Sequence, residues 1–234
     1  YHPIKSDIST LTEKLINEKF TGIIHMAAAT DVLWCDQHPR ECFKINVEGT
    51  QRVLDLARRN NCRLIYLSTA HVYGRPKINP ISEEHQTNPE SIYAASKLAG
   101  EILCRAYANS YGLDISILRL FSVYGPFSPD HLVTSRIISQ LNDKEIKLGN
   151  MTSKRDFIFI DDVINAIKLI FKKSKGFNIY NVGMGKSHSI FEICNLIKEI
   201  SGKNTPISTK SSLVRKHDIK EIMANNQKIK KIGR

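Results

Sequence analysis

Short apolar runs alternate with longer segments of helical periodicity through the first half of the chain. The apolar runs have the length and composition of buried strands and occur at 22–27, 63–68 and 115–121. Between them, residues 39–60 and about 90–110 repeat apolar positions every three to four residues, and Gly112 is placed to end the second helix. Strands separated by helix-length spacers predict a parallel sheet covered by helices on both faces.

The pattern becomes less regular after Gly125. Short strands are expected within 145–150, 155–160 and 177–183, and helices at 131–142 and 161–174. Ser189 and Glu192 form the capping box of a further helix that ends at Gly202. A polar stretch, 203–219, and a short basic helix near 225–232 complete the chain. At the other end, Thr10 and Glu13 predict a capped amphipathic helix over 9–20. We expect the second half to form a lobe laid against the sheet.

Composition narrows the class of protein. With 234 residues, 41% of them hydrophobic and 24% charged, the chain has the make-up of a globular protein. No apolar run approaches the ~20 residues of a membrane span, so no membrane association is expected. The five cysteines are scattered and never form C-x-x-C, which argues against a disulfide framework or a metal site. Their odd number predicts a reducing compartment, the cytoplasm.

The formal net charge is +11, mostly from lysine. Such an excess favours an anionic ligand, for example a nucleotide diphosphate. Nucleic acid is not expected as a partner, because no nucleic-acid-binding signature accompanies the charge. Most of the excess is interpreted as a solvated, lysine-rich surface.

The candidate chemistry lies between Arg63 and Lys97. The strand at 63–68 runs into the hydroxyl residues Ser68 and Thr69, and the following helix carries Tyr93 and Lys97. Residues four apart on a helix share one face, with Cβ atoms about 5–6 Å apart. A nearby ammonium lowers a tyrosine pKa from its usual ~10. The three groups could then take a proton from an alcohol whose carbon gives up a hydride.

The Tyr-x-x-x-Lys spacing alone is weak support for this chemistry. It occurs three times, and the copies at 1–5 and 73–77 contain proline or glycine, which disfavour a helix interior. Only Tyr93 and Lys97 have a helical context. The alternative is an exposed tyrosine above a solvated lysine.

A glycine-rich phosphate loop is missing from the sequence. Dinucleotide-binding sheets normally open with a strand, a G-x-G-x-x-G-type loop and a helix. This chain begins where a third strand would lie. Either its first two β-α units, about 30 residues each, are absent, or it does not bind a dinucleotide.

Nine short motifs occur in a characteristic order: SDI (6–8), HMAAATDV (25–32), NVEGT (46–50), STAHVYG (68–74), YAASK (93–97), LRLFSVYGP (118–126), RDFIFIDDV (155–163), YNVGMG (180–185) and RKHD (215–218). With these motifs the chain resembles the extended short-chain dehydrogenase/reductases, the NAD(P)-dependent sugar-nucleotide epimerase/dehydratase group typified by UDP-glucose 4-epimerase. The resemblance implies an α/β fold with a Rossmann-type parallel sheet and a small C-terminal substrate lobe. It divides the chain into an incomplete dinucleotide-binding domain, 1–125, and a mainly substrate-binding lobe, 126–234, with 155–185 returning to the sheet.

The resemblance also implies roles for particular residues. Tyr93 matches the catalytic base, Lys97 its partner and Thr69 the catalytic hydroxyl. The residues that match contacts to NAD or NADP are Asp7, Ile8, Met26, Ala27, Ala28, Ala29, Asn46, Ser68, Tyr93, Lys97 and Phe121. Those that match substrate contacts are Thr69, Ser122, Arg155, Arg215 and Asp218. Ser122 departs from the asparagine that many members have.

The two residues after Thr69 restrict which of the family's reactions is expected. Dehydratases of the family carry Asp-Glu there, and this chain has Ala70 and His71. Since alanine cannot transfer protons, we expect a 4-epimerase acting on a nucleotide-diphosphate sugar. A 4-keto-sugar-nucleotide reductase or decarboxylase is the alternative within the family, and a non-catalytic binding relative is the alternative outside catalysis. His71 is either an additional acid or a bystander. The resemblance further implies a homodimer formed through the helices at 39–60 and 90–110.

Overall fold

A four-stranded parallel sheet forms the centre of the protein. The computed structural model describes residues 7–8, 18–214 and 219–233. The strands stand in the order β1-β2-β3-β8, and their bounds are Gly22–His25, Arg63–Thr69, Ile115–Leu120 and Phe177–Val182. All three pairings are parallel, as the strand and helix rhythm predicted.

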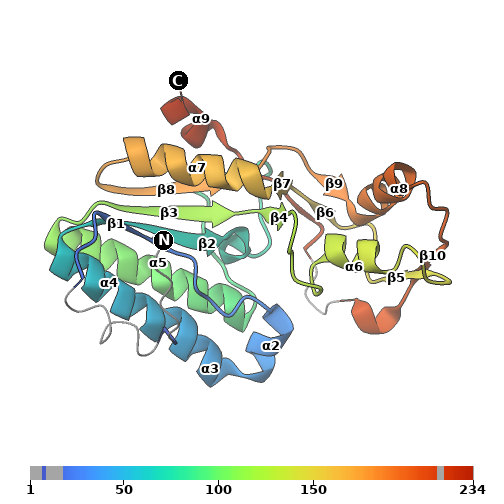
Figure 1. Ribbon diagram of the computed structural model, residues 1–234, viewed down its shortest axis with the longest axis horizontal. Helices are drawn as coiled ribbons and strands as arrows, with labels where there is room; N and C mark the ends of the chain where they lie inside the picture. Colours follow the sequence, from blue (N-terminus) through green and yellow to red (C-terminus); the bar gives the residue numbers. More distant parts are fainter. Residues whose placement is uncertain (1–6, 9–17, 215–218, 234) are drawn as a thin grey trace.

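Helices cover both faces of this sheet (Figure 1). On one face lie α4 (Gly49–Asn60) and α5 (Ile92–Tyr111), and on the other α7 (Ile160–Lys173) and α9 (Gln227–Gly233). Alternate strand residues enter two different cores. Tyr66 of β2 belongs to the core with α4 and α5, whereas its neighbour Ile65 belongs to the core with α7. Apolar residues at consecutive strand positions are therefore both buried.

The predicted helix at 39–60 forms with a change of pitch. It comprises α3 (Pro39–Phe43), a π-helical turn (Lys44–Glu48) and α4. Before it lies α2 (Val32–Gln37), capped by Asp31, which the periodicity did not predict because six residues are too few to establish a repeat. The helix expected at 90–110 begins at Ile92, where the Ser91 side chain caps it, and ends at Gly112 with φ of 65°.

The second half adds a lobe beside the carboxyl ends of the strands (Figure 1). Its helices are α6 (Val133–Ser139) and α8 (Ile190–Ser201), and the predicted capping box of Ser189 and Glu192 is present. Its short strands are β4 (Ser122–Tyr124), β5 (Ile146–Leu148), β6 (Lys154–Arg155), β7 (Phe157–Phe159), β9 (His188–Ser189), β10 (Ile207–Thr209) and β11 (Glu221–Ile222). Strand β10 lies inside the polar stretch 203–219, where no strand was predicted; its backbone pairs with β5.

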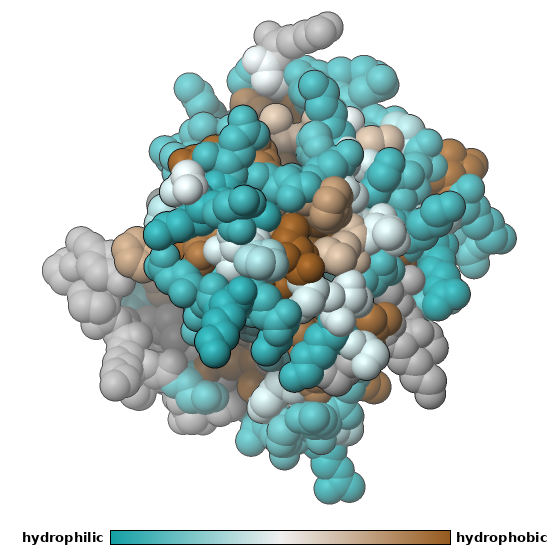
Figure 2. Space-filling model, turned by 90° about the vertical axis from the view of Figure 1, so that its right-hand side faces the viewer, coloured by the Kyte–Doolittle hydropathy of each residue, from teal (hydrophilic) through white to brown (hydrophobic). Residues whose placement is uncertain are grey.

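The lobe has its own small core and a few apolar side chains on its outer surface. Ile137, Ile146, Leu148 and Cys194 are fully or almost fully buried together. The end view of the molecule shows hydrophobic residues surrounded by hydrophilic ones (Figure 2). The large apolar side chains that α6 and α8 leave exposed are Ile138, Phe191, Leu196 and Ile200.

Three further expectations concern the helix at 9–20, membrane-spanning segments and the cysteines. The helix expected at 9–20, with Thr10 and Glu13, falls largely outside the described residues. Within the described ranges, every helix is too short or too polar to cross a bilayer. All five cysteines are buried and free.

Candidate active site

The candidate site lies where strand β2 ends. Ser68 and Thr69 are its last two residues, and both are buried. Thr69 then caps a 3₁₀ turn, Ala70–Tyr73, by accepting a hydrogen bond of 3.2 Å from the backbone N–H of His71. Helix α5 packs against β2 and this turn. The strand end and the first turns of α5 therefore meet, as expected from the sequence.

Tyr93 is buried at this meeting point, with 9% of its surface exposed. The side chain of Thr69, which is also buried, lies near this hydroxyl. Burial raises the pKa of Tyr93 to about 12, and the nearby Thr69 hydroxyl opposes that rise. Cys35 and Cys42 pack against the ring, and the His71 ring stands edge-on with a centroid separation of 6.2 Å. The exposed tyrosine of the alternative interpretation is not what the structure shows.

Lys97 is buried in the same helix but does not act on the tyrosine as predicted. Its amine lies 4.1 Å from the centroid of the Tyr66 ring on β2. The expected lowering of the Tyr93 pKa is absent, because the methylenes of Lys97 carry the ammonium onto another ring. Burial lowers the pKa of Lys97 to about 8, while the neighbouring Cys104 and Glu101 oppose that fall.

The loop after β1 carries four of the predicted cofactor contacts. Met26 and Ala27 are exposed, and Ala28 and Ala29 are half-buried. The Asn46 side chain accepts from the N–H of Ala29 (2.8 Å) and donates to its carbonyl (3.0 Å). It also donates to Ser96 on α5 (2.9 Å). Asn46 thus ties this loop to the helix that carries Tyr93, a role that the sequence did not reveal.

Behind this loop, His25 is buried against Thr50. The Thr50 hydroxyl donates to the carbonyl of Asn46 (2.6 Å), so it accepts from Nε2 of His25 at 2.9 Å. Burial and the charge of Lys97 lower the pKa of His25 to about 4. The imidazole is therefore neutral at pH 7 and carries its proton on Nε2.

The remaining predicted cofactor contacts are spread more widely. Ile8 packs against the start of α4 at Gly49, and Asp7 is exposed. Phe121 is buried among residues of the 3₁₀ turn and the C-terminal segment. The Ser68 hydroxyl donates to Glu101 at 2.5 Å, so it points toward the buried face of helix α5.

The predicted substrate contacts lie on the side of the lobe. Ser122 opens β4 and is half-buried. Arg155 donates to the carbonyl of Ile219 at 2.7 Å. Arg215 and Asp218 lie outside the described residues. Between these segments the buried carboxylate of Asp156 accepts hydrogen bonds from three backbone N–H groups, those of Met184, Gly185 and Ala224.

Two charged side chains that the sequence analysis passed over are buried behind the strand ends. Glu101 and Arg119 form an ion pair at 2.7 Å, each 4% exposed. The sequence did contain a signal: Arg119 interrupts the apolar strand ISILRL, and Glu101 falls on the same helix face as Tyr93 and Lys97.

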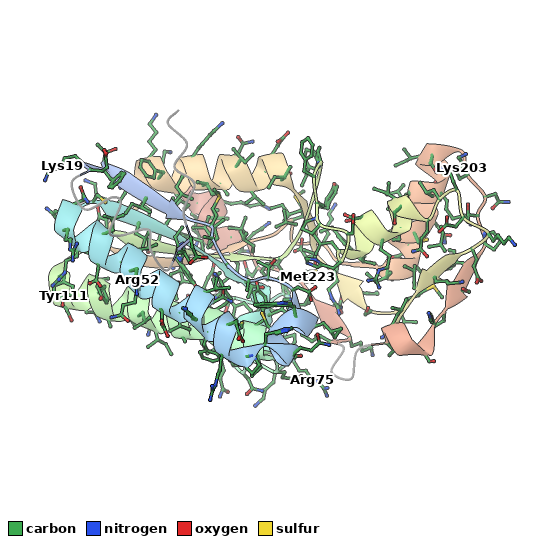
Figure 3. The ribbon with its side chains drawn as sticks, turned by 60° about the horizontal axis from the view of Figure 1, so that its bottom comes forward. Lys19, Arg52, Arg75, Tyr111, Lys203 and Met223 are labelled. Atoms are coloured by element: carbon green, nitrogen blue, oxygen red, sulfur yellow. The ribbon has the colours of Figure 1, made fainter. Side chains whose placement is uncertain are left out.

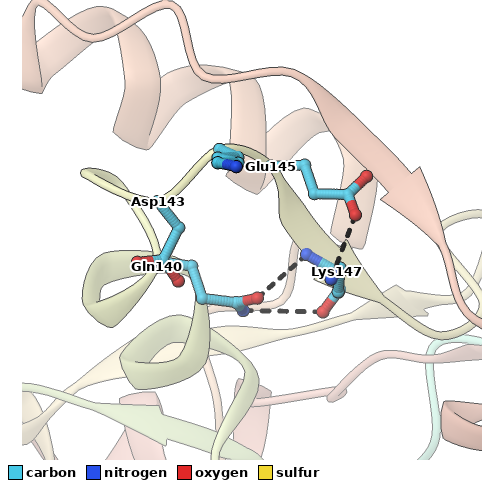
Figure 4. A pocket seen from close by; sticks show the side chains of 5 residues that line it. Gln140, Asp143, Glu145 and Lys147 are labelled. Carbon is cyan, nitrogen blue, oxygen red and sulfur yellow. Dashed lines mark hydrogen bonds and ion pairs between the residues drawn. The ribbon is translucent and has the colours of Figure 1, made fainter.

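Other parts of the described chain offer less chemistry. A surface pocket on the lobe is lined by Gln140, Asp143, Lys144, Glu145 and Lys147. Its groups bond to one another, since Gln140 pairs with the backbone of Lys147 and Glu145 with its amine (Figure 4). Across residues 7–8, 18–214 and 219–233, no cluster of His, Cys, Asp and Glu could hold a metal ion.

The fold and the site define an α/β protein of the doubly wound class, in which ligands bind outside the carboxyl ends of parallel strands. Residues 3–183 match the model of the NAD dependent epimerase/dehydratase family, and the chain belongs to this family.

Relatives and solved structures agree with that assignment. An uncharacterised UDP-glucose epimerase of Bacillus subtilis is 32% identical over 87% of this chain and 66% of its own length. The UDP-N-acetylglucosamine 4-epimerase of Methanobrevibacter ruminantium superposes with a TM-score of 0.91 at 27% identity, covering 99% of this chain and 76% of that one. The NAD complex of the Thermus thermophilus UDP-glucose 4-epimerase gives a TM-score of 0.85 at 26% identity over 97% and 75%. The chain spans 60–66% of the length of curated relatives at 30–32% identity.

The residues at the strand ends fit a nicotinamide dinucleotide. The amine of Lys97 is buried against an aromatic ring, and none of the described acceptors is hydrogen-bonded to it. A ribose hydroxyl would supply such an acceptor. The small side chains of Ala27, Ala28 and Ala29 leave room for a close approach along the loop after β1.

Proposed function

We propose that the protein is an NAD(P)-dependent sugar-nucleotide 4-epimerase. Its substrate is a nucleotide-diphosphate sugar that is oxidised transiently at C4 and reduced again on the other face. Thr69, Tyr93 and Lys97 form the catalytic group. The observation that carries this proposal is the buried hydroxyl pair of Tyr93 and Thr69 at the end of β2.

The two hydroxyls divide the proton chemistry between them. Thr69 holds the sugar oxygen beside the phenol, and Tyr93 exchanges a proton with that oxygen at Oη. In oxidation the O–H proton goes to Tyr93 and the C4 hydride leaves with its electron pair; reduction reverses both transfers. When bound, the nicotinamide supplies the acceptor and donor of this hydride.

The protonation state of Tyr93 determines whether the site needs a nearby positive charge. With a pKa of about 12, Tyr93 is protonated at neutral pH and is ready to act as an acid. To act as a base it needs positive charge nearby. Lys97 is one helical turn away, and its pKa of about 8 leaves it mainly protonated at pH 7. We infer that its amine leaves the Tyr66 ring and approaches the phenol and the cofactor ribose when the site is filled.

Further roles follow from position along the chain. We assign the dinucleotide to residues 1–125, with contacts from Asp7, Ile8, the loop Met26–Ala29 and Phe121, and with Asn46 and Ser68 acting through the groups they hold. We assign the sugar nucleotide to the lobe, 126–234, with contacts from Ser122, Arg155, Arg215 and Asp218. Arginine suits a diphosphate because its planar group bonds two oxygens at once.

The same reasoning favours epimerisation over dehydration. Ala70 follows Thr69 directly and carries no proton-transfer group. A 4-keto-sugar-nucleotide reductase or decarboxylase shares the same three catalytic residues and is the alternative. A homodimer formed through α4 and α5 is part of the proposal, and Ile102 on α5 is 62% exposed.

The test is turnover of UDP-, GDP-, CDP- and dTDP-sugars with NAD or NADP, followed by substitution of the phenol. Tyr93→Phe should lower kcat by about 10²–10⁴-fold, the contribution of a positioned acid–base group. Tyr111→Phe is the matched control, because Tyr111 is 48% exposed at the far end of the same helix (Figure 3). Near-normal turnover of the Tyr93→Phe protein would refute the assignment, and product from a 4-keto sugar alone would favour the reductase.

A further inference from the structure

A charged pair is buried directly behind the candidate catalytic residues. Arg119 belongs to β3 and Glu101 to α5. The guanidinium Nε donates to both oxygens of Glu101 (3.0 and 3.2 Å), and Nη2 donates to Oε2 (2.7 Å). The carboxylate also accepts from the hydroxyl of Ser68 at 2.5 Å. This pair is not among the groups that the proposed reaction uses.

The pair joins the strand that carries Thr69 to the helix that carries Tyr93. Ser68 stands opposite Arg119 in the pairing of β2 with β3, and it immediately precedes Thr69. Glu101 lies two helical turns beyond Tyr93 and one beyond Lys97. A single carboxylate therefore holds the end of β2, the end of β3 and the buried face of α5 at one point.

The same guanidinium extends these contacts to the turn after Thr69. Its Nη1 donates to the Tyr73 hydroxyl at 2.9 Å, and that hydroxyl donates to Oδ1 of Asn181 on β8 at 2.7 Å. Tyr73 ends the 3₁₀ turn that Thr69 caps. Thr69 is thus fixed from both sides, through Ser68 before it and through Tyr73 after it.

Stability alone gives no reason for this arrangement. Removing two charges from water is so unfavourable that buried ion pairs are often replaced by apolar residues without loss of stability. The ends of β2 and β3 could be joined by an apolar core, as they are further along the same strands by Ile65 and Leu118. What an ion pair with six directed hydrogen bonds adds is a defined position for the groups it holds.

We propose that Glu101 and Arg119 are a positioning pair, which holds the Thr69 hydroxyl in register with Tyr93 and Lys97. The inference rests on the proposed function, because it concerns the geometry of that site. A displacement of about 1 Å at reacting groups can lower a rate by about 10²-fold.

The negative charge of Glu101 also acts on Lys97. It opposes the effect of burial, which otherwise lowers the pKa of the amine to about 8. The titratable and aromatic groups that face this amine are His25 on β1, Cys42 on α3, Tyr66 on β2, and Glu101 and Cys104 on α5. Glu101 lies one helical turn from Lys97 and raises its pKa, so the loss of Glu101 should make Lys97 release its proton at lower pH.

The experiment replaces both charges together. Glu101→Leu/Arg119→Met keeps the volume of the pair and leaves no unpaired charge. Ser68→Ala removes only the link between the intact pair and the strand end. Glu145→Leu/Lys147→Met, which replaces an exposed pair on the lobe, is the matched control. Each protein is compared by thermal melting, by kcat and KM, and by the pH dependence of acetylation at Lys97 in the cofactor-free chain.

We expect the double variant to fold, with kcat lowered about ten- to a hundredfold and KM changed less. Lys97 should become reactive to acetylation at a lower pH. Ser68→Ala should lower kcat severalfold with little change in melting temperature, and the control should match wild type throughout.

Wild-type kcat and lysine reactivity in a folded double variant would overturn the proposal. If the double variant does not fold, unchanged kcat in Ser68→Ala overturns it instead. The acetylation profile needs no turnover. If the wild-type chain converts no nucleotide sugar, the proposed function fails, while the effect of Glu101 on Lys97 is still measured.

Discussion

The strand ends of the large sheet and the lobe beside them are built from different interactions. At the strand ends, buried side chains bond to one another: Glu101 to Arg119, Arg119 to Tyr73, and Tyr73 to Asn181. In the lobe, helices α6 and α8 and strand β5 form a small apolar core, and each strand has only two or three residues. Its charged pair Lys147–Glu145 has side chains that are 50% and 40% exposed.

This difference separates two tasks. Directed bonds in a buried region fix atoms to within a fraction of an ångström, as proton and hydride transfer require. Short strands and exposed side chains on a lobe can change without disturbing that geometry. On the proposed function, the strand ends carry the proton and hydride transfer, and the lobe binds the nucleotide sugar.

The largest effect should come from breaking the buried pair on one side. Glu101→Ala leaves the guanidinium of Arg119 buried and unpaired, and we expect a loss of about 3–5 kcal/mol in the free energy of unfolding. Glu145→Ala in the lobe should cause no measurable loss, since exposed pairs contribute little. Urea denaturation of both variants measures the difference. Equal effects would show that the two regions do not differ as described.

A second prediction concerns Lys97, whose burial opposes folding. The folded chain releases this proton near pH 8, whereas an unfolded lysine releases it near 10.5. Between these values the unfolded state binds more protons, so the contribution of Lys97 to stability improves as pH rises and is least favourable below pH 8. The cost at pH 7 is about 3 kcal/mol, since one pKa unit corresponds to about 1.4 kcal/mol.

Lys97→Met should therefore stabilise the protein at pH 7 and abolish its turnover. The measurement is the difference in unfolding free energy between wild type and variant from pH 7 to 10.5, which removes the contributions of other titrating groups. The stabilisation should stay nearly constant up to pH 8 and shrink from there to pH 10.5. A difference that does not change with pH would show that Lys97 is not buried in its charged form.

Much of this architecture could be predicted because it depends on local patterns. The parallel sheet, the covering helices and the capping box of Ser189 follow from periodicity and from side chains a few residues apart. The meeting of Thr69 with Tyr93 followed from a strand end preceding a helix. These features need little knowledge of residues distant in sequence.

The parts that escaped prediction depend on long-range contacts. The amine of Lys97 reaches Tyr66, 31 residues away along the chain, and Asn46 binds Ala29 and Ser96 on two other elements. Helical spacing places two side chains on one face but does not decide where a flexible lysine ends. The partners of Glu101 and Arg119 likewise become visible only when β3 is placed beneath α5.

A third prediction tests whether Asp156 supports sugar-nucleotide binding by the lobe or the chemistry at the strand ends. Asp156 accepts hydrogen bonds from three backbone N–H groups. An asparagine could accept only some of them, because its NH2 group would face the remaining N–H donors. Asp156→Asn should cost about 1–3 kcal/mol and raise KM for the sugar nucleotide more than it lowers kcat. Asp143→Asn, at an exposed position on the lobe, is the control. A fall in kcat with unchanged KM would place Asp156 with the strand ends instead.

Burial should also give Asp156 a characteristic pH dependence. Its pKa is raised above the usual 3.8 because desolvation outweighs the three hydrogen bonds. The folded state therefore binds this proton more tightly than the unfolded state, so the contribution of Asp156 is most favourable below pH 3.8 and decreases as pH rises through the folded pKa. Asp156→Asn should remove this dependence, which acid titration of the unfolding free energy can detect.

The smallest effect should come from the cap of α8. The Ser189 hydroxyl accepts from the N–H of Glu192 at 3.1 Å and satisfies one of the free donors at the start of the helix. Ser189→Ala should cost about 1 kcal/mol, and amide hydrogen exchange should increase in α8 without changing in α5. Ser201→Ala at the other end of the same helix is the control, because its hydroxyl bonds only to the carbonyl of Lys198. If exchange in α5 increased as much as in α8, the lobe and the strand ends would unfold as one unit, and the separation of tasks between them would have no basis in their stability.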